Sequence, residues 1–207
     1  IVGAHYDDDG GSTSGSAYIF KRSNTSWAQQ AKLLASDPGS SDYFGVSVAI
    51  SGNYAVVGAY AWDYYSNQGA VYVFRKTDGT ENWSQKTKLQ ASDGGSGDNF
   101  GIDVTIDGNY IIAGAYNNDD VYTNAGSAYV FTFTGETSSG NPYGWSQQKI
   151  LPSDPGQYDK FGNSVAISGD YAVVGSYKNN NDSGTAYIFI RDGTSWTQQT
   201  RLEPSDP

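Results

Sequence analysis

Short β-type runs of hydrophobic and polar residues, separated by polar turns, follow one another along the whole chain. Four such runs, which we label a to d, fill the last unit: "FGNSVAIS" (161–168), "YAVVGSY" (171–177), "TAYIFIR" (185–191) and "WTQQTRLE" (196–203). Runs c and d alternate apolar and polar side chains as half-buried strands do, and runs b and c are rich in β-branched and aromatic residues. A turn such as "SGD" between a and b is a strong hairpin signal. No segment combines helical spacing with caps, so the pattern predicts an all-β fold.

The four-run unit repeats. Its first half occurs as "FGVSVAISGNYAVVGAY" at 44–60 and "FGIDVTIDGNYIIAGAY" at 100–116, and part of it opens the chain as "IVGAHY" at 1–6. Four antiparallel strands in every 50 to 60 residues or so is the rhythm of a β-propeller blade. We therefore predict β-propeller blades with run a innermost and run d outermost. The blades are expected at about 1–43, which lacks its innermost strand, and at 44–99, 100–160 and 161–207, as a single propeller or part of one.

Two residue types recur at fixed places in the unit. A glycine interrupts run b, where a missing side chain permits close backbone approach, so we expect a packing role for it. These glycines are Gly3, Gly58, Gly114 and Gly175. A tryptophan opens run d, and we expect packing between blades or at their edges, with a platform for stacking sugars as the alternative. These tryptophans are Trp27, Trp83, Trp145 and Trp196.

The recurring phrases "FGxSVAISGxYAVVGAY", "GxAYIF" and "WxQQxKLxxSDPG" resemble the FG-GAP repeat family of integrin-α-type β-propellers. The resemblance covers essentially the whole chain. It implies extracellular binding and adhesion without catalysis, at a cell surface or outside the cell. Many FG-GAP repeats carry a D-x-D-x-D-G loop between the first two strands, but here that loop is only "SGNY", "DGNY" or "SGDY". It is too short to surround Ca²⁺ with its 6–8 oxygen ligands, so the family's usual calcium site is carried over to no residue.

Charge and composition narrow the range of partners. The net charge is −10, from 22 acidic and 12 basic residues, which argues against nucleic acid and favours cations or basic partners. Without cysteine the chain has no disulfide, thiolate metal site or cysteine nucleophile. No apolar run approaches the roughly 20 residues of a membrane span, so we predict no membrane insertion.

Aspartates gather in the loops that one face of the propeller should carry. Because the strands of a blade alternate in direction, the b–c and d–a loops emerge on the same face. The d–a loops keep two aspartates at fixed offsets, as a turn framework would. The b–c loops are more variable, and their aspartates are either turn-formers or ligands of a weak Ca²⁺ site. The candidate ligands are Asp7, Asp8, Asp9, Asp119, Asp120 and Asp182. Beyond Ca²⁺ we predict no cofactor.

Other candidate residues bear on binding rather than on catalysis. Trp62, Tyr64 and Tyr65 form an aromatic cluster in a b–c loop that blade packing does not demand, and they are the candidate ligand-binding residues. N-x-S/T triplets make Asn24, Asn82 and Asn181 candidate glycan acceptors. No catalytic motif is present. The single histidine, His5, aligns with Ala59 or a small neighbour in run b and is expected to be a partly exposed strand residue.

The sequence therefore predicts a non-catalytic extracellular recognition or adhesion module that binds a protein or a glycan through its b–c and d–a loops. The alternative is a structural subunit of a fibre or repeat array, assembled with further copies head-to-tail or by completion of the broken blade. The basic residues of run d, with those near the end of run c, are expected away from the aspartates, which would make the module electrostatically polar. In run d these are Lys32, Lys88, Lys149 and Arg201.

Overall fold

The computed structural model describes residues 1–63, 66–135, 144–179 and 182–205. These residues form fifteen β-strands and no helix. The strands make four antiparallel sheets, one of three strands and three of four, in which hydrogen-bonded neighbours follow chain order. The predictions of an all-β class and of propeller blades are therefore confirmed.

We number the sheets as blades 1 to 4. Blade 1 contains β1 (Val2–Ala4), β2 (Ser16–Ser23) and β3 (Ser26–Leu33). Blade 2 contains β4 (Val48–Ser51), β5 (Tyr54–Ala59), β6 (Ala70–Lys76) and β7 (Trp83–Leu89). Blade 3 contains β8 (Val104–Asp107), β9 (Tyr110–Ala115), β10 (Ser127–Gly135) and β11 (Gly144–Ile150). Blade 4 contains β12 (Phe161–Ser168), β13 (Tyr171–Ser176), β14 (Thr185–Asp192) and β15 (Ser195–Leu202).

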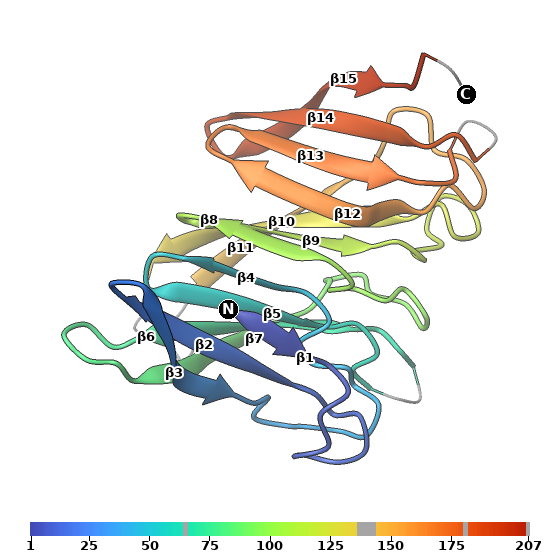
Figure 1. The fold of residues 1–207 in the computed structure, drawn as a ribbon. Coiled ribbons are helices and arrows are strands. Elements are labelled where there is room, and N and C mark those ends of the chain that lie inside the picture. Colours follow the sequence, from blue (N-terminus) through green and yellow to red (C-terminus); the bar gives the residue numbers. More distant parts are fainter. Residues whose placement is uncertain (64–65, 136–143, 180–181, 206–207) are drawn as a thin grey trace.

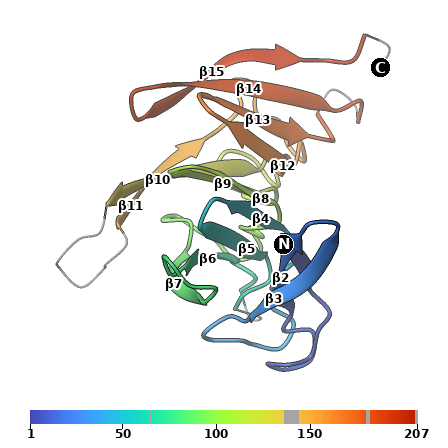
Figure 2. The same ribbon diagram turned by 60° about the vertical axis from the view of Figure 1, so that its left-hand side comes forward.

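The four sheets stack on one another in chain order (Figures 1 and 2). Strand β8 contacts both β4 and β12, so run a of each complete blade lies on the inner side, as predicted. The b–c and d–a loops emerge together on the right of Figure 1, and the a–b and c–d turns emerge on the left. We call the side with the b–c and d–a loops the loop face.

The hydrophobic cores lie between blades, because the c strands present different side chains to their two neighbours. In blade 2, Tyr72 and Phe74 pack edge-on against Phe44, with ring centroids 5.3 and 6.0 Å apart. This cluster also contains Ile19 and Leu33 of blade 1. The same arrangement recurs at the next two junctions, around Phe100 and around Phe161. The phenylalanine of each Phe-Gly step is thus the centre of an inter-blade core. Burying one such ring contributes about 1.5–3 kcal/mol.

In blades 1 to 3 the recurring glycine of run b is a point of close approach to the next blade, as predicted. At Gly175 of blade 4 the nearest atom to an added Cβ would be Cβ of Ser164 in the same blade, at 3.6 Å. A Cβ atom at Gly58 would lie 2.1 Å from the carbonyl oxygen of Gly101, and one at Gly114 would lie 1.8 Å from that of Gly162. Gly3 meets Gly45 in the same way, at 1.9 Å. No side chain fits in that space.

Three of the tryptophans that open run d pack between blades, as predicted. The indole nitrogen of Trp83 donates to Gln30 of blade 1 at 3.0 Å, and Trp145 packs in the core that joins blades 2 and 3. Trp196 is 2% exposed and meets Tyr110 of blade 3 edge-on. Trp27 of blade 1 is 65% exposed.

Candidate functional site

The first aspartate of each d–a loop is held in place by the blade that follows the loop. Asp37 accepts hydrogen bonds from the hydroxyl of Tyr72 at 2.9 Å and from Lys88 at 2.6 Å. Asp93 has the same two kinds of partner in blade 3, and Asp154 in blade 4. Burial alone would raise the pKa of Asp37, but hydrogen bonds from Lys88 and Tyr72 outweigh it and lower that pKa. These aspartates are structural groups of the loop face.

The lysines and the arginine of run d therefore do not lie away from the aspartates, and that prediction was wrong. On the loop face, Lys88 pairs with Asp37. Lys149 pairs there with both Asp93 and Asp120. Arg201 forms the equivalent pair with Asp154, and Lys32 pairs with Asp7 and Asp9 of its own b–c loop. Lys88 and Lys149 are the next-to-last residues of β7 and β11, at the strand ends that enter the d–a loops, so their side chains already lie beside the loop face.

The second aspartate of each d–a loop caps a tight turn. Asp98 accepts the backbone N–H of Gly95 at 2.8 Å, and the amide group of Asn118 donates to the same carboxylate at 2.9 Å. Asp159 receives equivalent hydrogen bonds from Gly156 and Asn179. A side chain from the following b–c loop thus closes the space above each of these aspartates.

At the junction of blades 1 and 2 this pattern changes. Asp42 accepts the N–H of Gly39 at 2.7 Å, but the position of Asn118 and Asn179 is occupied by Trp62. The equivalence is fixed by the loop backbone, since Trp62 and Asn118 accept the same hydrogen bond, from Gly69 and Gly126 respectively. Among the described residues, no side chain donates to Asp42.

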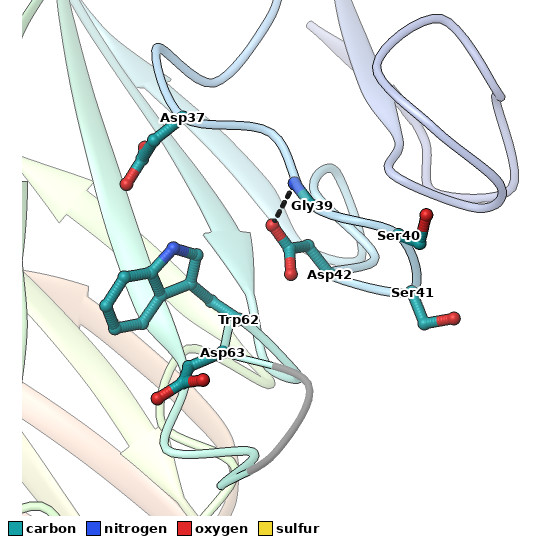
Figure 3. A pocket seen from close by; sticks show the side chains of 7 residues that line it. All are labelled: Asp37, Gly39, Ser40, Ser41, Asp42, Trp62 and Asp63. Atoms are coloured by element: carbon teal, nitrogen blue, oxygen red, sulfur yellow. Dashed lines mark hydrogen bonds between the residues drawn. The ribbon is translucent and has the colours of Figure 1, made fainter.

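A cavity of about 770 Å³ opens at this place (Figure 3). Its lining consists of Asp37, Gly39, Ser40, Ser41, Asp42, Trp62 and Asp63. The ammonium group of Lys88 lies 3.8 Å from the centroid of the Trp62 ring. Asp42 is only 3% exposed, and burial raises the pKa of its carboxyl. The cavity therefore joins one large aromatic surface to several hydrogen-bond acceptors, a composition typical of small-molecule sites.

A second cavity, of about 390 Å³, adjoins the first, because Ser41 lines both. Its other lining residues are Tyr43, Tyr60, Ala61, Asn67 and Asn99. The rings of Tyr43 and Tyr60 are stacked, with centroids 5.2 Å apart and planes 10° apart. Burial raises the pKa of Tyr60, so its hydroxyl stays protonated near neutral pH. No residue in this lining carries a charge there.

The candidate Ca²⁺ ligands of blade 1 all have protein partners. Asp7 accepts hydrogen bonds from Ser16, Tyr18 and Lys32 at 2.8 to 3.0 Å. Asp8 accepts a backbone N–H within its own loop, and Asp9 pairs with Lys32.

In blade 3, Asp119 accepts the backbone N–H of Asn124, and Asp120 pairs with Lys149. Asp182 of blade 4 is exposed and has a φ of +67°. Within the described part of the chain, no group of three acidic or histidine side chains could hold a metal ion. The Ca²⁺ site remains a prediction.

Of the other predicted residues, Tyr64, Tyr65 and Asn181 lie outside the described residues. Asn24 and Asn82 are exposed in c–d turns, on the side opposite the loop face. The alignment of His5 with Ala59 was wrong. Gly3 pairs with Ala17 as Gly58 pairs with Val71, so His5 is equivalent to Tyr60. Its ring lies beyond the end of β1, with its centroid 4.1 Å from that of Tyr6 and the two planes tilted by 48°.

The sequence model of the FG-GAP repeat matches residues 1–20, 27–74, 83–131 and 145–189, which is more than three quarters of the chain. The chain belongs to the FG-GAP repeat family. Each of the three longer matches begins at the tryptophan of run d and ends in run c of the following blade, so the FG-GAP repeat spans a blade junction. No curated protein shows significant similarity to the chain. Among the described residues, no helix is long and apolar enough to cross a membrane.

The a–b turns are as short in the structure as the sequence indicates. Only two residues separate β4, which ends at Ser51, from β5, which begins at Tyr54. The first of them, Gly52, has a φ of +55°, as a tight hairpin turn requires. The D-x-D-x-D-G loop of many FG-GAP repeats has no counterpart there.

Proposed function

We propose that this FG-GAP repeat protein is a non-catalytic extracellular recognition module that binds a protein or glycan ligand with its loop face. The observation that carries this proposal is the pair of adjoining cavities at the junction of blades 1 and 2. Together they bring Trp62, Tyr43 and Tyr60 beside carboxylate, hydroxyl and amide groups. Aromatic anchors next to a few fixed polar groups are what ligand sites use.

Comparison between blades supports the same site. Where the equivalent of Trp62 is Asn118 or Asn179, the side chain donates to the second aspartate of the preceding d–a loop and fills the space above it. Trp62 makes no such hydrogen bond to Asp42, and its ring lines a cavity. The fold does not require a tryptophan at this position, because blades 3 and 4 form with an asparagine there.

Arrays of glycans and of peptides, probed with the whole chain, test the proposal. We expect the bound ligands to be lost on Trp62→Asn, which installs the residue of blades 3 and 4. The matched control is Trp27→Asn, since Trp27 is an exposed tryptophan of run d far from the loop face. Ligands that survive Trp62→Asn but are lost on Trp27→Asn would contradict the proposal.

A second candidate function is structural assembly with further copies, favoured by the outer face of blade 4. Leu202 of that face is 52% exposed, whereas its equivalents at the three junctions, Leu33, Leu89 and Ile150, are 3 to 7% exposed. On blade 1, Phe20 is 37% exposed, whereas its equivalent Phe74 is 3% exposed. A head-to-tail contact between these faces would form rings or fibres.

Sedimentation over a range of concentrations, together with electron microscopy, tests assembly. If the two faces meet, the chain forms larger species that Leu202→Lys abolishes. Trp62→Asn should leave them intact. A monomer at every concentration removes this candidate.

A further inference from the structure

We propose that the two adjoining cavities bind a neutral, hydroxyl-rich ligand of the saccharide class. One sugar ring would lie beside the stacked tyrosines, and its neighbour would reach Trp62 and the carboxylates. The inference rests on the proposed recognition function and names the chemistry of its ligand.

The tyrosine cavity has the chemistry of a site for an uncharged polar ligand. Tyr43 and Tyr60 offer aromatic surface, which suits the apolar faces of a sugar ring. The amides of Asn67 and Asn99 and the hydroxyl of Ser41 offer both donors and acceptors to sugar hydroxyls. A charged ligand would find no opposite charge in this lining.

Backbone hydrogen bonds hold these groups in place. Asn99 donates its N–H to the carbonyl of Asn67 at 3.2 Å, and Tyr43 donates to that of Thr13 at 3.2 Å. All four residues have positive φ, between +48° and +57°. The site is therefore built by the junction itself, which lowers the cost of ordering it when a ligand binds.

The tryptophan cavity supplies strong acceptors for the hydroxyls of a second sugar. Asp42 has one oxygen bonded to Gly39, and among the described residues nothing donates to its other oxygen. Asp63 is held by the hydroxyl of Ser66 at 2.8 Å. Hydrogen bonds from hydroxyls to carboxylates are stronger than those between neutral groups.

The charge of this cavity decides against an acidic saccharide. Asp37, Asp42 and Asp63 carry three negative charges, and the neighbouring Lys88 carries one positive charge. A uronic acid or sulfated sugar would meet like charge there, which costs binding energy. The two volumes, about 770 and 390 Å³, each fall within the roughly 300–1,000 Å³ of small-molecule sites.

The test is an NMR titration of the whole chain with a panel of neutral disaccharides: maltose, cellobiose, lactose and chitobiose. Glucuronic acid is the anionic comparator and N-acetyl-lysine amide the cationic one. We expect at least one disaccharide to shift the indole N–H of Trp62 and the amides of Tyr43 and Asn99. Neither comparator should do so at the same concentration.

Variants connect the shifts to the cavities. Tyr60→Ala should weaken binding by about tenfold, equivalent to about 1.4 kcal/mol, whereas Tyr60→Phe keeps the ring and should bind nearly as well. The matched control is Tyr116→Ala, the same position in blade 3, which lines neither cavity and should leave binding unchanged. A dispersed spectrum shows in each case that the variant has folded.

The outcomes separate the two proposals. If no disaccharide shifts these signals, or if N-acetyl-lysine amide shifts them more, the saccharide inference is overturned. The recognition function then survives provided that array ligands of another class still depend on Trp62. If no ligand of any class depends on Trp62, both proposals fall.

Discussion

A pair of glycine substitutions tests how the blades are joined. Gly114 and Gly175 occupy the same position of run b in blades 3 and 4. A Cβ atom at Gly114 would lie 1.8 Å from the carbonyl oxygen of Gly162, 2.8 Å from its carbon and 3.3 Å from its Cα. At Gly175 the nearest atom would be Cβ of Ser164, at 3.6 Å, which is an ordinary contact. Gly114→Ala and Gly175→Ala are thus the same chemical change in two environments.

The size of the effect follows from these distances. The neighbour of Gly114 is backbone, which cannot rotate away, so blade 4 must move outward by more than 1 Å to restore a carbon–oxygen contact of about 3.3 Å. A gap of about 0.5–1 Å already forfeits a quarter to a half of the dispersion energy of the facing atoms. We expect Gly114→Ala to lower the free energy of unfolding by about 3 kcal/mol, the upper part of the range for overpacking. Gly175→Ala should stay within about 0.5 kcal/mol of the parent chain.

Urea unfolding followed by tryptophan fluorescence and by far-UV circular dichroism measures both variants. With a slope of about 1–3 kcal/mol per molar urea, the midpoint of Gly114→Ala should fall by at least about 1 M. Because stacked repeats can unfold in parts, the two signals need not coincide. Equal midpoints for the two variants would refute the inter-blade contact as the reason for the glycine.

Three further predictions concern the cores and the loop face. Trp196→Ala should lower the free energy of unfolding by about 3–5 kcal/mol, because Trp196 is 2% exposed. Trp27→Ala, at an exposed position, should lower it by no more than about 0.5 kcal/mol. Similar values for the two variants in urea unfolding would show that Trp196 does not anchor blade 4 on blade 3. Tyr72→Phe should cost about 1–2 kcal/mol, since it removes the hydroxyl of a buried tyrosine that donates to the carboxylate of Asp37; an unchanged midpoint would make that hydrogen bond irrelevant to stability. Hydrogen bonds, above all from Ser16, lower the pKa of Asp7 from 3.8 to about 2, so its stabilisation is complete above about pH 4 and is lost as the pH falls toward 2. Asp7→Asn should therefore reduce the loss of thermal stability between about pH 5 and 2, and an unaltered pH profile would contradict this.

The fold could be predicted because repetition gives the same evidence several times. One glycine in a strand is ambiguous, but Gly3, Gly58 and Gly114 at the same place in successive units indicate one recurring contact. The same holds for the tryptophans of run d. Each unit independently repeats the alternation of run c, so its strands and their order could be read without a structure.

The candidate site could be predicted only in part, because it depends on the place where the repeat departs from itself. Trp62 stood out as an extra aromatic residue in a loop, but its equivalence with Asn118 becomes visible only when the loop hydrogen bonds are known. Tyr43 gave no signal, because its partner Tyr60 lies across a blade junction. The reach of Lys88 to Asp37 was missed for a similar reason: the two are 51 positions apart in the sequence.

A crystal structure of the chain with its strongest array ligand would show which surface binds the ligand. We expect the ligand to lie on the loop face between Trp62 and Tyr60, with one of its polar groups within hydrogen-bond distance of Asp42. A ligand on the outer face of blade 4 at Leu202 would contradict this expectation. So would one in the hollow of about 320 Å³ between the a–b turns at Gly108 and Gly169.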